Sequence, residues 1–315
     1  FAVHSGPEAN RHRFNAKVTS QDLNETYLPA FKDLVDVKVE IVMCAYNRLN
    51  DEPCCGSELL LNNLLRENWN FNGHVVSDCG AIYDIKSNHN YTISDEEGVA
   101  YAIKGGVDLN CGSLYNLIPN AIDQGLLKES DLDKSLKRLF MTRLKLGILK
   151  KVNDNPYDGL DEKNINTKEH VSLARDVASK SIVLLKNENN ILPLSKNINR
   201  LFITGPNAAN INTLLGNYNG LSPNIVTPLE GIADKVSNGT IIRFNKGVDL
   251  INNNDRTEWS ASLAGGSDVT IAVMGISALI EGEEGAAISS DANGDRNSIS
   301  LPRNQINYLK SLRKS

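Results

Sequence analysis

Residues 74–78 read His-Val-Val-Ser-Asp, a short apolar run that ends in a carboxylate and is followed by Cys79 and Gly80. Such a run is typical of a parallel strand that is covered on both faces. Residues 39–46 form a similar run, and between the two Ser57 begins a helical pattern rich in leucine. Strands that alternate with helices over short connections predict a parallel α/β sheet or barrel.

The same alternation extends in both directions along the chain. Capping residues at Thr19, Ser94 and Ser130 predict helices that begin there, and residues 107–110 predict a further strand. Residues 151–168 are polar and rich in turn formers, which predicts a linker between domains at 1–150 and 169–315. Beyond the linker, a helix over 168–181 and strands at 200–204, 241–244 and 269–274 predict a doubly wound α/β sandwich. Residues 285–300 predict a long loop.

Composition and motifs exclude several classes of function. The 315 residues are 41% hydrophobic, which fits a packed core. Their net charge of −5 argues against proteins that bind nucleic acids or anionic membranes, which need a basic surface. No apolar run approaches the roughly 20 residues of a membrane span. The five histidines lack metal-ligand spacing, and residues 205–210 lack the glycine order of a phosphate loop, so we expect no metal or cofactor. Gly-x-Ser-x-Gly is absent as well.

Carboxylates at predicted strand ends are the candidate catalytic groups. Asp78 follows an apolar strand, where parallel α/β folds hold their active sites; a helix-capping role is the alternative. Glu281, Glu283 and Glu284 follow another strand, and their mutual repulsion would raise the pKa of one of them, as a general acid needs. A solvated acidic loop is the alternative there. Two more residues at strand ends, for which a structural role stays open, are Tyr46 and Asp108.

Five cysteines allow two interpretations. They are Cys44, Cys54, Cys55, Cys79 and Cys111. Their odd number leaves at least one thiol if disulfides form, and no Cys-x-x-Cys pair suggests a metal site. Buried free thiols and disulfides both remain open from the residues alone.

Taken together, these segments resemble glycoside hydrolase family 3 in its β-xylosidase/β-glucosidase branch, over almost the whole chain. Residues 43–50 (Met-Cys-Ala-Tyr-Asn-Arg-Leu-Asn) resemble a barrel signature, residues 74–78 the nucleophile strand and residues 105–112 the strand after it. The ordered set is completed by residues 1–16, 181–194, 216–218, 227–229, 294–296 and 301–302. Each motif is short, and their common order carries the resemblance.

The resemblance implies a fold and a site. It implies the C-terminal part of a (β/α)8 TIM-type barrel followed by part of an α/β/α sandwich. Asp78 would be the nucleophile of a retaining mechanism. Glu283, which follows Gly282, would be the acid/base, with Glu281 as the alternative. Arg11 and Tyr46 match positions that hold the sugar in the first subsite.

The implied activity is that of a retaining exo-β-glycosidase that removes terminal xylose or glucose from an oligosaccharide or β-glycoside. Specificity for α-L-arabinofuranose or N-acetylglucosamine is possible within the same class. The alternatives from other classes are a non-catalytic carbohydrate-binding homologue and a nucleotide-dependent α/β enzyme, which the missing glycine fingerprint disfavours. The resemblance also implies periplasmic or extracellular export, with disulfides Cys44–Cys55 and Cys79–Cys111 and a free Cys54.

The chain departs from the family pattern in two respects. The family's Lys-His pair would stand immediately before Phe1, and no signal peptide opens the sequence. A barrel needs about 250 residues, more than precede the linker, so we expect this stretch to belong to a longer enzyme and to be inactive and poorly stable alone. Cys79 stands where many relatives carry Trp, a replacement that fits the xylosidase-like branch.

Overall fold

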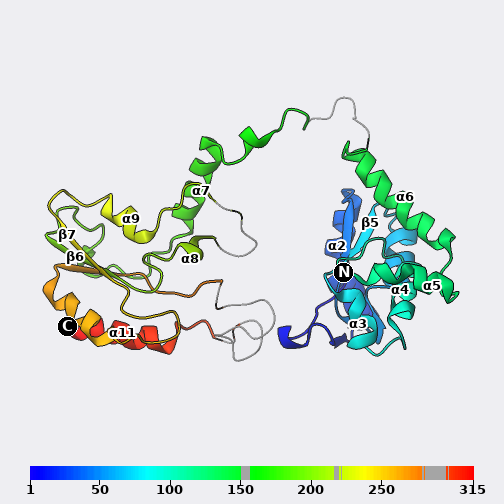
Figure 1. The fold of residues 1–315 in the computed structure, drawn as a ribbon, viewed down its shortest axis with the longest axis horizontal. Helices are drawn as coiled ribbons and strands as arrows, with labels where there is room; N and C mark the ends of the chain where they lie inside the picture. The colour runs from blue at the N-terminus through cyan, green and yellow to red at the C-terminus, as the bar shows by residue number, and fades with distance from the viewer. Residues whose placement is uncertain (150–156, 216–219, 221, 279, 281–295, 297) are drawn as a thin grey trace. The chain divides into compact units, whose positions relative to one another are not determined.

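The chain forms two compact units, Phe1–Ile165 and Asn166–Ser315, each of which is described by itself (Figure 1). The computed structural model describes residues 1–149, 157–215, 220, 222–278, 280, 296 and 298–315. The division between the units lies inside the stretch 151–168 that the sequence marks as a linker.

Two parallel strands form the centre of the first unit. Strand β2 (Ile41–Cys44) pairs with β5 (His74–Ser77), so that Cys44 lies opposite Ser77. The strand predicted at 74–78 is therefore confirmed, with Asp78 just beyond its end. The strand predicted at 107–110 is reduced to one parallel bridge between Val76 and Leu109. A smaller sheet joins β1 (Asn15–Ala16), β3 (Arg48–Leu49) and β4 (Glu52–Pro53).

The helices of the first unit mostly begin where the sequence predicts. The hydroxyls of Thr19, Ser57 and Ser94 each accept a hydrogen bond from a backbone N–H of the first helical turn. The helical elements are η1 (Glu8–Asn10), α1 (Ser20–Asp22), η2 (Leu23–Tyr27), α2 (Leu28–Asp36), η3 (Glu58–Asn68), α3 (Ala81–Ser87), α4 (Asp95–Lys104), η4 (Leu114–Leu117), α5 (Ile118–Asp123), α6 (Glu129–Lys145) and η5 (Glu162–Asn164).

The start of α6 corrects one prediction. The cap is Lys128 rather than Ser130, because the Asp131 carboxylate reaches back and accepts a hydrogen bond from the Lys128 N–H at 3.0 Å. The helix therefore begins at Glu129, two residues earlier than a cap at Ser130 would place its start.

The core of the first unit fixes the backbone that carries Asp78. Val75 of β5, Leu61 of η3 and Val99 of α4 are completely buried in one apolar cluster. Helix α6 packs against both β5 and α4, and Figure 1 shows α4, α5 and α6 grouped beside β5. The end of β5 is thus held by packing on the strand and by pairing with β2.

The second unit is built on a three-stranded parallel sheet. Strand β6 (Arg200–Thr204) lies between β7 (Ile241–Asn245) and β8 (Val269–Ala272), which confirms the three predicted strands. The predicted helix over 168–181 is also present, as α7 (Lys168–Ser181). The other helical elements are η6 (Glu188–Asn190), α8 (Ile211–Leu215), α9 (Pro228–Ala233), α10 (Thr257–Ser262), η7 (Leu263–Gly266) and α11 (Arg303–Lys314).

Helices cover both faces of this sheet. Leu201 and Ile203 of β6 pack in one cluster with Leu229 and Ile232 of α9. On the other face, the Tyr308 hydroxyl of α11 hydrogen-bonds the side chain of Thr204 at 2.7 Å, and Figure 1 shows α9 and α11 on opposite sides of β6 and β7. Alternate residues of β6 thus face different helices, as a covered parallel sheet requires. The chain is an α/β protein, and none of its described helices is long and apolar enough to cross a membrane.

Candidate active site

Asp78 lies at the carboxyl end of β5, half-buried, in a turn that leads into α3. Its N–H donates to the Cys44 carbonyl at 3.2 Å, which continues the pairing of β2 with β5 by one step. Gly80 then adopts φ 86°, a left-handed conformation that favours glycine, and α3 begins. No side chain caps α3, since its N-cap residue is Gly80. The geometry therefore argues against Asp78 as a helix cap.

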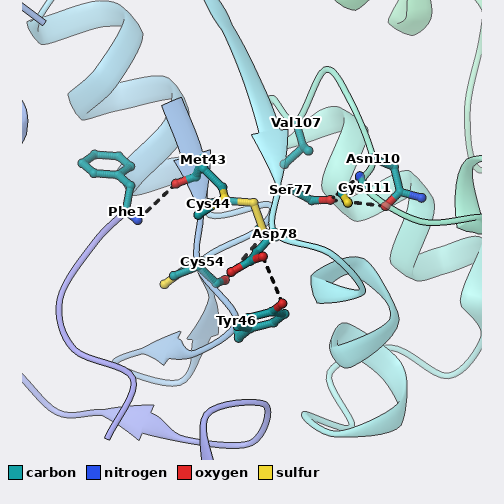
Figure 2. Close-up of a disulfide and its surroundings, with 12 residues drawn as sticks. Phe1, Met43, Cys44, Tyr46, Cys54, Ser77, Asp78, Val107, Asn110 and Cys111 are labelled. Atoms are coloured by element: carbon teal, nitrogen blue, oxygen red, sulfur yellow. Dashed lines mark hydrogen bonds between the residues drawn. A yellow bond between two sulfur atoms is a disulfide. The ribbon is translucent and has the colours of Figure 1, made fainter. Parts of the chain in front are cut away.

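Two donors hold one oxygen of the Asp78 carboxylate. The Cys79 N–H donates to Oδ1 at 2.7 Å, and the Tyr46 hydroxyl lies 3.0 Å from the same atom. The Tyr46 hydroxyl is also 2.9 Å from the Cys79 carbonyl, its other acceptor. Figure 2 shows Tyr46 and Asp78 facing one another from neighbouring strand ends. In the described part of the chain, every hydrogen bond to this carboxylate is made to Oδ1, and Oδ2 is left for another partner.

Arg11 and His12 contact the ring of Tyr46. The guanidinium carbon of Arg11 lies 4.9 Å from the ring centroid, and Arg11 also pairs with Glu8 at 2.7 Å. The His12 ring centroid lies 4.3 Å from that of Tyr46, and its Nδ1 lies 2.7 Å from the buried Asp84 carboxylate. The structure thus gathers Arg11, Tyr46 and Asp78, whose predicted roles stay predictions, and it places two further residues beside them, His12 and Asp84, which sequence reasoning did not single out. The available signal was that His12 adjoins Arg11 and that the carboxylate of Asp84 stands between residues 81–83 (Ala-Ile-Tyr) and Ile85.

Asp108 has a structural role, which settles an alternative that the sequence left open. Its fully buried carboxylate accepts from Arg66 at 2.7 Å, from Arg138 at 2.9 Å and from the Val75 N–H at 2.9 Å. Val75 lies near the amino end of β5, away from Asp78. Burial lowers the pKa of Arg66 to about 10, against the opposing charge of Asp108, so this guanidinium remains protonated near neutral pH.

The acidic cluster lies outside the described residues. Glu281, Glu283 and Glu284 belong to the stretch 281–295 that the structure does not describe. The assignment of Glu283 as acid/base, with Glu281 as the alternative, therefore stays a prediction.

The cysteines pair as the resemblance implies. Disulfides join Cys44 to Cys55 and Cys79 to Cys111, while Cys54 is a buried free thiol. Burial raises the pKa of Cys54 to about 11, which keeps the thiol protonated and unreactive. The described residues hold no group of three or more His, Cys, Asp or Glu side chains that could bind a metal ion.

His89 makes the stability of the first unit depend on pH. Burial, followed by the charge of Arg48, lowers the pKa of His89 to about 4. The unfolded chain, with a histidine pKa of about 6.5, binds the proton more readily, so stability is full above this value and falls as the pH drops towards 4. We expect up to about 1.4 kcal/mol to be lost per pH unit in that window. Urea unfolding, followed by hydrogen exchange in peptides of this unit, would measure it; a His89→Gln variant with the same slope would contradict the assignment.

Comparisons with known proteins match most of this chain. Residues 1–142 match the family model described as glycosyl hydrolase family 3 N terminal domain, and residues 182–315 match the corresponding C-terminal domain. A xylan 1,4-β-xylosidase of Xylanibacter ruminicola is 44% identical over 256 residues, which cover 80% of this chain and 29% of that protein.

Two solved structures match this chain over its whole length. A GH3 exo-β-xylosidase in complex with a xylobiose aziridine activity-based probe superposes with a TM-score of 0.82 at 30% identity, over 100% of this chain and 40% of the other. A β-glucosidase from Listeria innocua in complex with glucose gives a TM-score of 0.78 at 25% identity, over 100% of this chain and 42% of the other. The chain thus spans well under half the length of these proteins.

Proposed function

This chain belongs to glycosyl hydrolase family 3, and on that basis we propose that the protein containing it is a retaining exo-β-glycosidase that releases terminal β-linked xylose or glucose. The similarity to a named β-xylosidase favours xylose, and the similarity to a glucose-bound β-glucosidase keeps glucose as the second candidate. Its substrate would be an oligosaccharide or another β-glycoside, and its chemistry would need no cofactor.

The observation that carries the proposal is the asymmetric hydrogen bonding of Asp78. Oδ1 is held by the Cys79 N–H and the Tyr46 hydroxyl, whereas Oδ2 has no donor among the described residues. A carboxylate fixed through one oxygen presents the lone pairs of the other to an electrophile. This is the arrangement that a nucleophile needs for in-line attack on an anomeric carbon.

The reaction would proceed in two displacements. Asp78 Oδ2 bonds to the anomeric carbon while the glycosidic C–O bond breaks, and the acid/base gives its proton to the departing oxygen. Water then attacks the glycosyl ester, gives a proton back to the acid/base and releases Asp78. We assign the acid/base to Glu283, with Glu281 as the alternative. The two carboxyl groups would approach to about 5–5.5 Å, because direct attack leaves no room for a water molecule.

The fold supports a finer assignment of the two units. We assign residues 1–150 to the C-terminal part of a (β/α)8 barrel, because β2, β5 and the bridge at Leu109 are successive parallel segments separated by helices. Residues 151–168 would be the linker. Residues 169–315 would be part of an α/β/α sandwich, since helices cover both faces of the β7-β6-β8 sheet.

Two further features fit the proposal: the donors of Arg11 suit sugar binding, and the disulfides suit an extracellular or periplasmic location. Arg11 offers forked donors that suit neighbouring sugar hydroxyls, and its packing on Tyr46 orients it at the site. The two disulfides favour an oxidising compartment. We therefore propose Arg11 and Tyr46 as sugar-binding residues and export as the localisation.

A covalent label tests the proposal directly. The full-length protein would be incubated with a 2-deoxy-2-fluoro-β-xyloside and, separately, with the matching glucoside, and the labelled peptide would be mapped by mass spectrometry. We expect the sugar on Asp78, and faster labelling by the preferred glycone. A folded protein that neither reagent labels would refute the xylosidase/glucosidase assignment.

Removal of the Tyr46 hydroxyl tests the contact that holds Oδ1. A Tyr46→Phe variant keeps the ring against Arg11 and His12 but loses the bond to a charged acceptor. A hydrogen bond of this kind is worth about 1.5–3 kcal/mol, so we expect kcat/KM to fall about 10- to 100-fold. Steady-state rates on aryl β-xylosides would show it, and a rate within twofold of wild type would exclude the contact from catalysis.

Paired substitutions separate Glu283 from Glu281. Loss of the true acid should abolish hydrolysis of substrates with poor leaving groups and spare those with activated phenolate leaving groups, which depart without a proton. We expect this selective loss for Glu283→Ala, with Glu281→Ala as the matched control. The reverse pattern would move the role to Glu281.

A further inference from the structure

Both disulfides adjoin residues of the proposed site, but they lie in different surroundings. Cys44 is the last residue of β2. Cys44 and its disulfide partner Cys55 lie in the core, where the two residues are 0% and 2% exposed. Cys79 is exposed and lies in the turn directly after Asp78, outside any helix or strand. The backbone at Cys44 is held by the β2–β5 ladder, whereas no ladder holds the backbone at Cys79.

Cys79 supplies both of its backbone polar groups to the site, one from each of the two peptide units that meet at its Cα atom. Its N–H donates to Asp78 Oδ1 at 2.7 Å, and its carbonyl is an acceptor for the Tyr46 hydroxyl at 2.9 Å. A displacement of the Cys79 Cα atom, which joins these two peptide units and carries the disulfide side chain, would therefore disturb the Asp78 carboxylate and the Tyr46 hydroxyl together.

The partner Cys111 is tied to the same strand end. Its N–H donates to the Ser77 side chain at 2.9 Å, and its carbonyl accepts from the Gly80 N–H at 2.9 Å. Figure 2 shows Ser77 and Cys111 adjacent, with Asn110 beside them. The disulfide, with Cα atoms 4.4 Å apart, thus closes a ring through Ser77, Asp78 and Cys79.

We propose that the Cys79–Cys111 disulfide is a positioning element of the reaction: it holds the backbone on both sides of the Cys79 Cα atom in the position that orders Asp78 and Tyr46. This inference rests on the proposed function, in which Asp78 is the nucleophile. Without the covalent link, the segment of Cys111 would be joined to this turn through two hydrogen bonds, from the Cys111 N–H to the Ser77 side chain and from the Gly80 N–H to the Cys111 carbonyl. The Cys79–Cys111 disulfide therefore supports the catalytic rate kcat, whereas the Cys44–Cys55 disulfide supports the stability of the core.

The first test uses a Cys79→Ser/Cys111→Ser double variant of the full-length protein. A displacement of about 1 Å at a reacting group costs up to about 100-fold in rate, so we expect kcat, and the rate of labelling by the 2-fluoro sugar, to fall about 10- to 100-fold. KM should change less than kcat, because Arg11, the proposed sugar-binding residue, is held by Glu8 and by the ring of Tyr46, outside the Cys79 turn. The matched control is Cys54→Ala, which removes a buried thiol outside both disulfides and should leave kcat unchanged.

Hydrogen exchange gives a readout that does not depend on activity. In the double variant, the amides of residues 78–80 and 111 should exchange faster, while those of β2 and η3 should keep their wild-type rates. Wild-type exchange at 78–80 together with a wild-type labelling rate would overturn the positioning role. A wild-type protein that takes no label at Asp78 would refute the proposed function instead, and the exchange data would still decide whether the disulfide orders the turn.

Reduction of the folded protein avoids any failure of the variant to fold. Dithiothreitol gives two electrons and two protons to the disulfide, forming two thiols, and is itself oxidised to its cyclic disulfide. Brief treatment followed by iodoacetamide should alkylate Cys79 and Cys111 before the buried pair, and kcat should fall in proportion to the alkylated fraction. Full kcat after complete alkylation at these two positions would overturn the inference.

Discussion

An Asp78→Gly variant of the full-length protein is expected to lose kcat by about 10⁴-fold or more, because no other group would form the glycosyl ester. The turn around Asp78 should survive, since its backbone is held by the Cys44 carbonyl, by the Cys79–Cys111 disulfide and by the start of α3. Circular dichroism and steady-state rates on aryl β-xylosides would separate loss of fold from loss of chemistry.

Azide distinguishes the nucleophile from the acid/base. In the space left by the Asp78 side chain, azide can attack the anomeric carbon in one displacement as the aryloxide departs. This single inversion gives an α-glycosyl azide and restores part of the rate. A β-glycosyl azide would instead identify Asp78 as the acid/base, since the product would then come from two inversions. Asp36→Asn, at an exposed ion pair on α2, is the control and should behave as wild type.

An Asp108→Ala variant should strongly destabilise the first unit. It would leave Arg66 and Arg138 without their common carboxylate, and it would remove the acceptor of the Val75 N–H. Breaking a buried pair in this way costs about 3–5 kcal/mol, because the remaining charge stays buried and uncompensated. The side chain of Asp108 is 0% exposed, that of Arg66 10% and that of Arg138 25%, so Arg66 would bear most of this cost.

Hydrogen exchange in increasing urea, read on peptides that contain β5, would measure this loss in the full-length protein. The matched control is Asp36→Ala, which breaks the exposed Lys32–Asp36 pair of α2 and should cost less than about 1 kcal/mol. Equal losses for the two variants would show that Asp108 is not the buried anchor described above. Loss of activity in Asp108→Ala should follow loss of fold, in contrast to Asp78→Gly.

Local sequence signals determined the elements that carry the site. The apolar run at 74–78 gave β5 and put Asp78 at its end, and Thr19, Ser57 and Ser94 cap the helices that they were predicted to cap. These signals act between residues at most four apart, so the chain shows them without its fold. The short apolar run at 107–110 forms only the parallel bridge between Leu109 and Val76 among the described residues.

Ordered motifs, rather than any one element, determined the family, and through the family the disulfide pairs and the roles predicted for Arg11, Tyr46 and Asp78. Local pattern could not do this. Without the resemblance, the local pattern describes Asp78 and Asp108 alike, as carboxylates at strand ends. It also leaves open whether the five cysteines are free thiols or form disulfides.

Only the tertiary structure distinguished the surroundings of these similar residues. It placed the Tyr46 hydroxyl on Asp78 across 32 residues of sequence and His12 on Asp84 across 72, and it buried Asp108 between two arginines. The physical reason is the range of the forces involved. Caps and strand patterns are satisfied within one turn or one strand, and so they can be read along the chain. The role of a carboxylate depends on which donors and charges the fold brings to it, and those come from distant segments.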